Sequence, residues 1–314
     1  MPEAPPLRIA AIVPCHNEAL AVGKVVADLR RAVPGMTVYV YDNASSDDTA
    51  LVAREAGAIV RHERTKGKGN VVRRAFADVE ADVYVLIDGD DTYAAADLPA
   101  MIDALLSGPC DHVLGARRET GMGAYRPGHE LGNRGFNWLV SGVFGTPVSD
   151  MLSGYRVLSR RFVKSFPALS REFEIETELT VHAMSLRVPQ IEVPVGFKDR
   201  PAGSESKLRT YHDGFRILSL IVGLIRHERP MMFYGIAGAV IALIGLIVGI
   251  PVIVDFVSTG LVPRLPAALL AVGIVIVAFL SWTIGLILDG VLKSRREISR
   301  LNYLLYAATP QPGR

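Results

Sequence analysis

Three carboxylates lie within four residues of the segment VLIDGDDTY (85–93): Asp88, Asp90 and Asp91. Carboxylates this close repel one another, so water, a basic partner or a metal ion must compensate their charge. Only Gly89 separates Asp88 from Asp90, and a glycine lets the backbone turn so that both acids face one ligand. Oxygen ligands suit Mg²⁺ or Mn²⁺, and magnesium commonly binds carboxylates together with substrate phosphates. The spacing predicts a metal–diphosphate site formed by Asp88 and Asp90, and a solvated turn is the alternative.

A loop of glycine and lysine residues, TKGKGN at 65–70, opens a helical pattern ahead of this acidic cluster. Lys66 and Lys68 could meet a phosphate there, and backbone N–H groups at the start of the helix would add to the attraction. The loop is not a P-loop, because the pattern G-x-x-x-x-G-K-[ST] is absent from it. The loop is therefore a second candidate phosphate contact.

The elements that must position these residues have the pattern of an α/β domain with a mainly parallel sheet. Three nearly continuous apolar, β-rich runs resemble buried parallel strands: 8–13, 37–42 and 83–88. Helical patterns follow the strands, at 18–32, 47–56 and 68–78. Polar clusters come after the strands, and ligands of such sheets bind at the carboxyl ends of strands. Asp42 and Asp88 are therefore expected at one edge of the sheet, although 43–48 also reads as a simple turn and helix cap.

Two uncharged apolar runs, 231–254 and 265–288, follow this domain. Each exceeds the roughly 20 residues that span the apolar core of a bilayer, so both are predicted transmembrane helices. A pair of buried core helices is the alternative, but uncharged runs of this length are rare in soluble cores. Polar residues form one narrow helical stripe in the segment 207–230, which predicts an amphipathic helix at the membrane interface, with a core helix as the alternative.

Basic residues on the flanks predict the orientation of the spans. Arg226 and Arg229 precede the first span, and the segment 289–314 after the second span is basic. The loop 255–264 between the spans has Arg264 as its only basic residue. The positive-inside rule then places both termini and the catalytic domain in the cytoplasm, at an inner or plasma membrane. The segment 289–314 is a predicted cytoplasmic tail, and its helical part is a candidate for homo-oligomer contacts. No cleavable signal peptide is expected at the start of the chain.

Composition excludes other classes. The chain has 34 Lys and Arg against 32 Asp and Glu, so it lacks the basic excess of a nucleic-acid-binding protein. Its only cysteines, Cys15 and Cys110, have neither metal-binding spacing nor a disulfide framework.

Four motifs in order, VPCHNE, YDNASSDDT, KGKGN and LIDGDDTY, resemble those of the family 2 glycosyltransferases of GT-A fold. DMLSGYRVLSRR (150–161) and the two apolar spans are similar in particular to the dolichyl- and polyprenyl-phosphate sugar synthases. The resemblance implies a Rossmann-like GT-A catalytic domain over 1–206 and a Mg²⁺ or Mn²⁺ cofactor. It also implies a UDP- or GDP-sugar donor and a polyprenyl phosphate acceptor, of undecaprenyl or dolichyl type, in the lipid bilayer.

The resemblance also implies roles for individual residues. The residues that would bind the nucleotide-sugar are Pro14, Asn17, Glu18, Asp42, Lys68, Asp88 and Gly89. The residues that would bind the lipid phosphate are Arg117, Arg134, Arg200 and Lys207. Asp88 and Asp90 would hold the metal, with Asp91 an accessory at best. Asp150 stands where family members have an acid close to the transfer site, and Thr92 replaces a glutamine that many relatives have there.

These roles imply an inverting transfer of one sugar to the lipid phosphate. A phosphate monoester has its second pKa near ~6, so the acceptor needs no strong base and Asp150 is expected to orient rather than deprotonate. The acids Glu174, Glu176 and Glu178 are candidates either for acceptor contacts or for a helix cap. Two other functions remain open: a polysaccharide synthase, against which two spans and no Q-x-x-R-W motif argue, and a non-catalytic nucleotide-sugar-binding scaffold.

Overall fold

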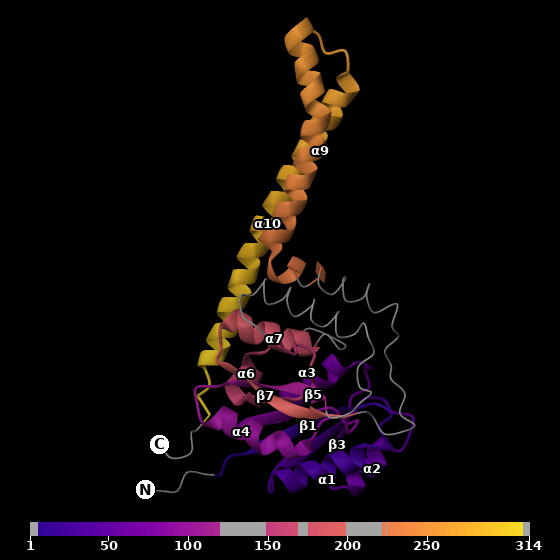
Figure 1. The fold of residues 1–314 in the computed structure, drawn as a ribbon, viewed down its shortest axis with the longest axis vertical. Coiled ribbons are helices and arrows are strands. Elements are labelled where there is room, and N and C mark those ends of the chain that lie inside the picture. The colour runs from indigo at the N-terminus through magenta and orange to yellow at the C-terminus, as the bar shows by residue number, and fades with distance from the viewer. Residues whose placement is uncertain (1–5, 120–148, 169–174, 199–221, 224, 310–314) are drawn as a thin grey trace. The chain divides into compact units, whose positions relative to one another are not determined.

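The computed structural model describes residues 6–119, 149–168, 175–198, 222–223 and 225–309 (Figure 1). The chain divides into two compact units, Met1–Leu208 with Ile298–Arg314 and Arg209–Glu297. The N-terminal and C-terminal ends of the chain thus belong to the same unit. The predicted interfacial helix at 207–230 lies largely outside the described residues, and its described part is helical at 222–223 and 225–228.

The first unit contains a sheet of seven strands in the order β3-β2-β1-β4-β6-β5-β7. The strands are β1 (Ile9–Cys15), β2 (Thr37–Asp42), β3 (Ile59–His62), β4 (Val83–Leu86), β5 (His112–Glu119), β6 (Arg156–Ser159) and β7 (Gln190–Phe197). β1 is parallel to β2 and β4, β2 is parallel to β3, and β5 is parallel to β7, whereas β6 is antiparallel to both β4 and β5. The predicted mainly parallel sheet is confirmed. The sequence did not predict β3, because its four residues are exposed or half-buried and form no apolar run.

The strand order reverses direction at β1. β2 pairs with one side of β1 and β4 pairs with the other, so the loops that follow β1 and β4 lie at the switch point of the sheet, where sheets of this kind bind ligands. The loop after β4 carries Asp88 and Asp90, which places both acids at this switch point.

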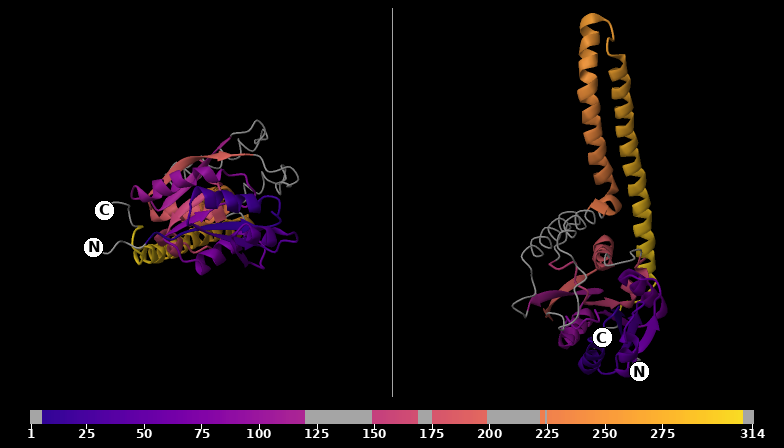
Figure 2. Two further views of the ribbon diagram at one scale, coloured as in Figure 1. Left: turned by 90° about the horizontal axis from the view of Figure 1, so that it is seen from below. Right: turned by 90° about the vertical axis from the view of Figure 1, so that its right-hand side faces the viewer.

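Helices cover both faces of the sheet, as the two views of Figure 2 show. The helices of this unit are α1 (Val22–Ala32), α2 (Thr49–Glu55), α3 (Lys68–Asp78), α4 (Leu98–Leu106), α6 (Arg160–Ser165) and α7 (Ile175–Leu186), with a short 3₁₀ turn, η1 (Ala95–Asp97). One buried apolar cluster joins α1, α2 and α4 to the sheet, and a second joins α3, α6 and α7 to its other face. This three-layer arrangement explains why β1 and β4 are apolar at almost every position.

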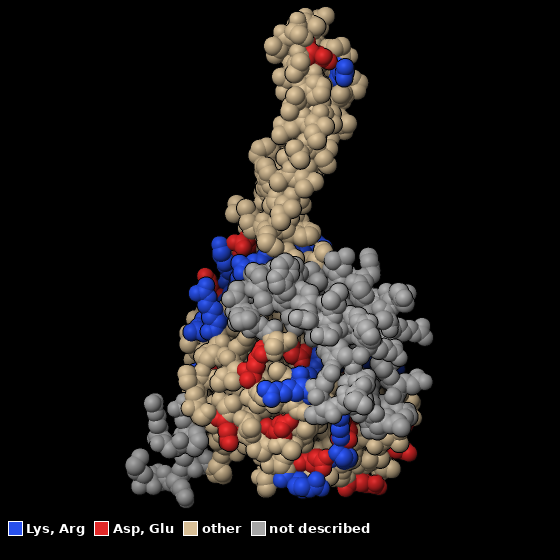
Figure 3. All heavy atoms as spheres, viewed as in Figure 1, with Lys and Arg blue, Asp and Glu red and all other residues tan. Residues whose placement is uncertain are grey.

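The second unit contains α9 (Pro230–Thr259) and most of α10 (Leu265–Leu304). The most apolar windows of these helices have mean hydropathies of 2.8 and 2.5, and only 17% of each window is buried. Core helices would be mostly buried, so the alternative reading as a soluble core does not hold for them. Figure 3 shows their paired surface almost without charge along its length. Both helices are therefore long and apolar enough to span a membrane.

Small residues bring α9 and α10 together. A Cβ added at Gly238 would lie 2.5 Å from Trp282 Nε1, and one added at Gly245 would lie 3.0 Å from Val275 Cγ2. The Trp282 indole donates a hydrogen bond of 3.0 Å to the Gly235 carbonyl. Close helix approach at glycines is a common packing mode of membrane helices.

α10 continues well past residue 288, where the second apolar run ends, and its last turns belong to the first unit. Tyr303 is buried in the cluster that contains α3, α6 and α7, and its hydroxyl donates a 2.6 Å hydrogen bond to Asp111 Oδ2. Arg161 forms two hydrogen bonds, of 2.6 and 2.7 Å, with the same carboxylate. The segment predicted as a basic tail thus begins as helix, and from Ile298 onward it is part of the sheet-containing unit.

Candidate active site

The loop after β4 runs against β1 so closely that only glycine fits at position 89. A Cβ added at Gly89 would lie 2.3 Å from Cys15 Sγ and 3.4 Å from the Pro14 carbonyl oxygen. Gly89 is not among the residues with positive φ, whereas Asp91 has a φ of 59°. The expectation that Gly89 supplies backbone freedom is therefore wrong: close approach selects the glycine, and Asp91 makes the left-handed turn.

Thr92 fixes the orientation of Asp90. The Thr92 hydroxyl donates a 2.6 Å hydrogen bond to Asp90 Oδ1, and the Thr92 backbone N–H donates to the same oxygen at 3.2 Å. Both residues are buried. At the position where many relatives have a glutamine, this chain thus has a side chain that holds the second acid of the pair.

Asp91 is compensated by two lysines. Its Oδ1 lies 3.0 Å from Lys24 Nζ, on α1, and its Oδ2 lies 2.7 Å from Lys198 Nζ, just after β7. Both of its oxygens are thereby engaged in ion pairs. Because both Asp91 oxygens contact lysines, Asp88 and Asp90 are the better candidates for two carboxylates that bind one cation.

Lys68 forms ion pairs with Asp88 and with Glu176, an acid that is distant in sequence. Its ammonium contacts Asp88 Oδ1 and lies 2.5 Å from Glu176 Oε1, in the first turn of α7. Burial alone would lower the pKa of Lys68, but attraction to the two carboxylates outweighs it and raises that pKa. Burial raises the pKa of Glu176, although Lys68 opposes the shift. Lys68 is therefore charged and sits between two acids, and its contact with a diphosphate remains a prediction.

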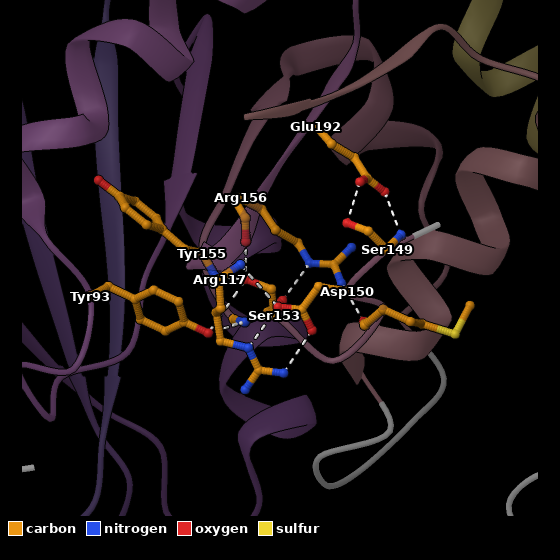
Figure 4. Close-up of polar contacts among 11 residues, drawn as sticks. Tyr93, Arg117, Ser149, Asp150, Ser153, Tyr155, Arg156 and Glu192 are labelled. Atoms are coloured by element: carbon orange, nitrogen blue, oxygen red, sulfur yellow. Dashed lines mark hydrogen bonds and ion pairs between the residues drawn. The ribbon is translucent and has the colours of Figure 1, made fainter. Parts of the chain in front are cut away.

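Arg117 and Asp150 form a bidentate ion pair (Figure 4). Arg117 Nε and one terminal nitrogen donate to the two Asp150 oxygens at 2.6 and 2.7 Å, and the Arg117 backbone N–H donates at 3.2 Å. Only 8% of the Asp150 side chain and 21% of that of Arg117 are exposed. Asp150 thus fixes the guanidinium of Arg117 near the end of β5, and its orienting rather than basic function in transfer stays a prediction.

The turn 150–154 is held by a fully buried arginine that the sequence analysis did not select. Arg156 donates to the carbonyl oxygens of Ser153 and Met151 at 3.0 and 2.9 Å, and Figure 4 shows both bonds. It also contacts Thr180 Oγ1 at 2.8 Å and His112 Nε2 at 3.0 Å. Burial, and then the neighbouring charge of Arg156, hold the pKa of His112 well below its usual value, so this imidazole is neutral and accepts the bond.

This turn also adjoins the acidic loop. The Gly154 backbone N–H donates a 2.9 Å hydrogen bond to the Tyr93 hydroxyl, which directly follows the acidic loop. A Cβ added at Gly154 would lie 2.5 Å from Asp88 Oδ2. The turn 150–154 therefore packs against Asp88, and residue 154 must be a glycine because a Cβ has no room there.

The predicted nucleotide-contacting residues lie at the carboxyl ends of β1 and β2. Asp42 ends β2 and is bonded to the Ser45 N–H at 3.3 Å and to His62 Nδ1 at 3.1 Å. The Asn17 side chain accepts a 2.8 Å bond from the Ser46 N–H. Pro14 lies within β1, and the Glu18 carbonyl begins the hydrogen bonding of α1. The structure thus gathers these residues on the same edge of the sheet as Asp88, as expected for carboxyl ends of parallel strands.

Asn43 organises the loop that leads to Lys68. Its amide donates to the carbonyls of Glu63 and Thr65 at 2.9 and 2.8 Å, and its oxygen accepts from the Gly67 N–H at 2.7 Å.

The other predicted phosphate contacts lie outside the described residues: Arg134, Arg200 and Lys207. Glu174 also lies outside them.

Asp88 and Asp90 remain the predicted ligands of a divalent cation that also binds a phosphate. Within the described residues no cluster of three or more His, Cys, Asp or Glu side chains has metal-binding geometry. Asp88 and Asp90 are a pair, and Asp88 Oδ1 meets Lys68 while its side chain remains 29% exposed. A site of two carboxylates completed by substrate phosphates and water is the arrangement that Mg²⁺ prefers.

A model of glycosyl transferase family 2 matches residues 10–166, which contain β1 to β6 and both candidate metal ligands. The chain belongs to this family. Among relatives of this family 2 enzyme, glycosyltransferase AglJ of Haloferax volcanii is 31% identical over 93% of the chain and 96% of its own length. The dolichyl-phosphate hexose transferase of the same organism is 29% identical over 70% of the chain and 95% of its own length.

The fold also matches solved structures. Glucosyl-3-phosphoglycerate synthase of Mycobacterium tuberculosis, in a complex with Mn²⁺, UDP and its product, aligns with a TM-score of 0.57 at 20% identity. The alignment covers 70% of this chain and 79% of the synthase. The likeness confirms the GT-A fold of the family 2 enzyme.

Proposed function

We propose that this glycosyltransferase transfers a single hexose from a UDP- or GDP-sugar to a polyprenyl phosphate at the cytoplasmic face of a membrane. The observation that carries the proposal is the Asp88–Asp90 pair at the β1–β4 switch point, in a chain that continues into two helices with long uncharged runs. A relative named as a dolichyl-phosphate hexose transferase supports the lipid acceptor. The Mn²⁺ and UDP bound by the structural neighbour support the metal and the donor class.

The residues of this chain would prepare the donor for transfer. Asp88 and Asp90 would hold a Mg²⁺ or Mn²⁺ ion, with Asp90 kept in place by Thr92. When bound, the ion would supply positive charge for the diphosphate that leaves. The ammonium of Lys68, which contacts Asp88, adds a second positive charge to the same place. The residues at the carboxyl ends of β1 and β2, among them Asn17 and Asp42, would bind the nucleoside.

The acceptor would react by direct displacement. An oxygen of the polyprenyl phosphate attacks the anomeric carbon, the bond to the nucleoside diphosphate breaks, and its electron pair stays on the leaving phosphate, with inversion. A phosphate monoester is largely ionised above its second pKa of about 6, so no proton has to be removed first. Arg117, held by Asp150, would attract the acceptor phosphate against the charge of the donor. Arg134, Arg200 and Lys207 are proposed to share this task.

Two features support a cytoplasmic orientation. Residues up to Leu208 and residues from Ile298 onward belong to one compact unit, so an even number of crossings must separate them. If α9 and α10 both cross, the short connection at 260–264 lies on the opposite side. The basic residues Arg226 and Arg229 precede α9, and Lys293 follows the uncharged run of α10, as the positive-inside rule predicts for the cytoplasmic side.

A transfer assay tests the proposal. Purified full-length protein is incubated with undecaprenyl phosphate, Mn²⁺ and a panel of labelled UDP- and GDP-sugars, and the lipid products are separated. A lipid-linked monosaccharide is expected; a polymer would indicate a polysaccharide synthase, and bound donor without product would indicate a scaffold. Asp88→Asn and Asp90→Asn should each abolish transfer while the protein still folds. Asp91→Asn is the matched control, since asparagine tolerates the left-handed φ of 59° and transfer should persist.

A further inference from the structure

Glu176 is a buried carboxylate beside the proposed donor site. It lies in the first turn of α7, and only 6% of its side chain is exposed. Lys68 joins it to Asp88, because the ammonium is 2.5 Å from Glu176 Oε1 and also contacts Asp88 Oδ1. A single ammonium thus serves two carboxylates, so this group of three charges is net negative.

The second oxygen of Glu176 has no hydrogen-bond donor. Within the part of the chain that the structure describes, Glu176 Oε2 is buried and accepts no hydrogen bond. A buried carboxylate oxygen without a donor is unfavourable, and the partial positive charge at the start of a helix compensates it only in part. An unpaired oxygen so close to Asp88 points to a donor group that arrives with the substrate.

The chemistry of a nucleotide-sugar allows one part of it to fill this role. The diphosphate presents only acceptor oxygens and negative charge, which Glu176 would repel. The hexose carries several hydroxyl donors and is bonded directly to the diphosphate that Asp88 would hold. Gly154 packs directly against the group, since an added Cβ would lie 3.0 Å from Lys68 Nζ and 2.5 Å from Asp88 Oδ2.

On the basis of the proposed function, we propose that Glu176 Oε2 accepts a hydrogen bond from a hydroxyl group of the donor hexose. Glu176 is then a specificity-determining residue, and Lys68 holds its carboxylate in place through Oε1. A site built to bind a hydroxyl discriminates strongly against a sugar that lacks it, because the buried acceptor is left unpaired. A buried water molecule on Oε2 is the competing occupant, and it would not distinguish a nucleotide-sugar from the free nucleotide.

Binding measurements on Glu176→Gln test this inference. The amide keeps an oxygen for Lys68 and turns the other position into an N–H donor. Full-length protein in detergent with Mn²⁺ is titrated with UDP-glucose and GDP-mannose, and separately with UDP and GDP. We expect nucleotide-sugar affinity to fall about 10- to 100-fold, with nucleoside diphosphate affinity changed less than about twofold. Glu80→Gln, at an exposed acid paired with Arg160, is the control and should change neither affinity.

Donors that lack single hydroxyl groups identify the contact. The deoxy-sugar that lacks the bound hydroxyl should bind the wild type about 10- to 100-fold more weakly, yet bind Glu176→Gln almost as well as the intact sugar does. Equal losses for nucleotide-sugar and nucleotide would overturn the inference, since Glu176 would then act only through Lys68. Unchanged affinities would overturn it in favour of bound water. Failure of the wild type to bind any nucleotide-sugar would instead contradict the proposed function itself.

Discussion

Replacing Arg156 with methionine should destabilise the turn beside the acidic loop. Methionine has a similar length but no donors, so the carbonyls of Met151 and Ser153, the Thr180 hydroxyl and the His112 imidazole each lose a partner. Burial lowers the pKa of Arg156 to about 10, so the guanidinium is charged at neutral pH and its four described partners are all uncharged. The side chain therefore contributes through these hydrogen bonds and not through an ion pair.

The size of the effect follows from these bonds. A hydrogen bond from a charged donor contributes about 1.5–3 kcal/mol, so the four bonds represent a gross loss of about 6–12 kcal/mol. Burying the guanidinium costs several kcal/mol, which the apolar replacement recovers. The expected net decrease in the free energy of unfolding is about 3–5 kcal/mol. For a unit of this size that corresponds to a fall in melting temperature of about 6–20 °C.

Thermal unfolding of the full-length protein in detergent, followed by intrinsic fluorescence, measures this change. Arg74→Met is the matched control: Arg74 is on the surface of α3, where it pairs with Asp78, and its loss should leave the melting temperature almost unchanged, because exposed ion pairs contribute little. The transfer rate of Arg156→Met should also fall, because the turn that begins at Asp150 would no longer hold Arg117. An Arg156→Met protein that melts within 2 °C or so of the control would refute the reasoning.

Further predictions concern close packing and charge. Gly89→Ala should reduce stability and donor binding together, because its Cβ would lie 2.3 Å from Cys15 Sγ. Adding Cys15→Ala to this variant should restore much of its stability and donor binding. A double variant without such a recovery would contradict the steric explanation. Burial alone would raise the pKa of Asp111, but hydrogen bonds from Arg161, Ser159 and Tyr303 outweigh it and lower that pKa. The stabilisation by Asp111 is then complete above its unfolded pKa of about 3.9 and is lost as pH falls through the folded value. Melting curves should therefore show Asp111→Asn much less stable at pH 7, with the difference from wild type shrinking below about pH 4.

Much of the fold could be predicted from local patterns. The apolar runs that became β1, β2 and β4 were recognisable because strands buried on both faces are apolar at nearly every position. The predicted helix at 68–78 matches α3, which starts at Lys68 and ends at Asp78. The short strand β3 was missed because an exposed strand carries no such run. The strands β5 to β7 were not assigned, since their pairing includes an antiparallel strand inserted between parallel ones.

The candidate site was predictable only in part. Asp88, Asp90 and Asp42 could be selected because each stands directly after or at the end of an apolar run. Glu176 was named among three neighbouring acids, but nothing in the motif EFEIETEL indicates which acid meets Lys68. Arg156 gave no signal apart from its place in an otherwise apolar strand, where a buried charge requires partners from several segments.

The sequence by itself determined the parallel sheet, the position of the acids at its carboxyl edge and the two uncharged helices, because periodicity, run length and residue type are local properties. Tertiary structure decided which charges meet. Lys68 lies between Asp88 and Glu176, Arg117 is bound by Asp150, and Tyr303 reaches Asp111 from the end of α10. These contacts depend on the strand order and on how α7 and α10 pack, and no local pattern contains that information. The sequence indicates that position 89 needs a glycine, but only the distance to Cys15 shows that lack of space, and not backbone freedom, is the reason for that glycine.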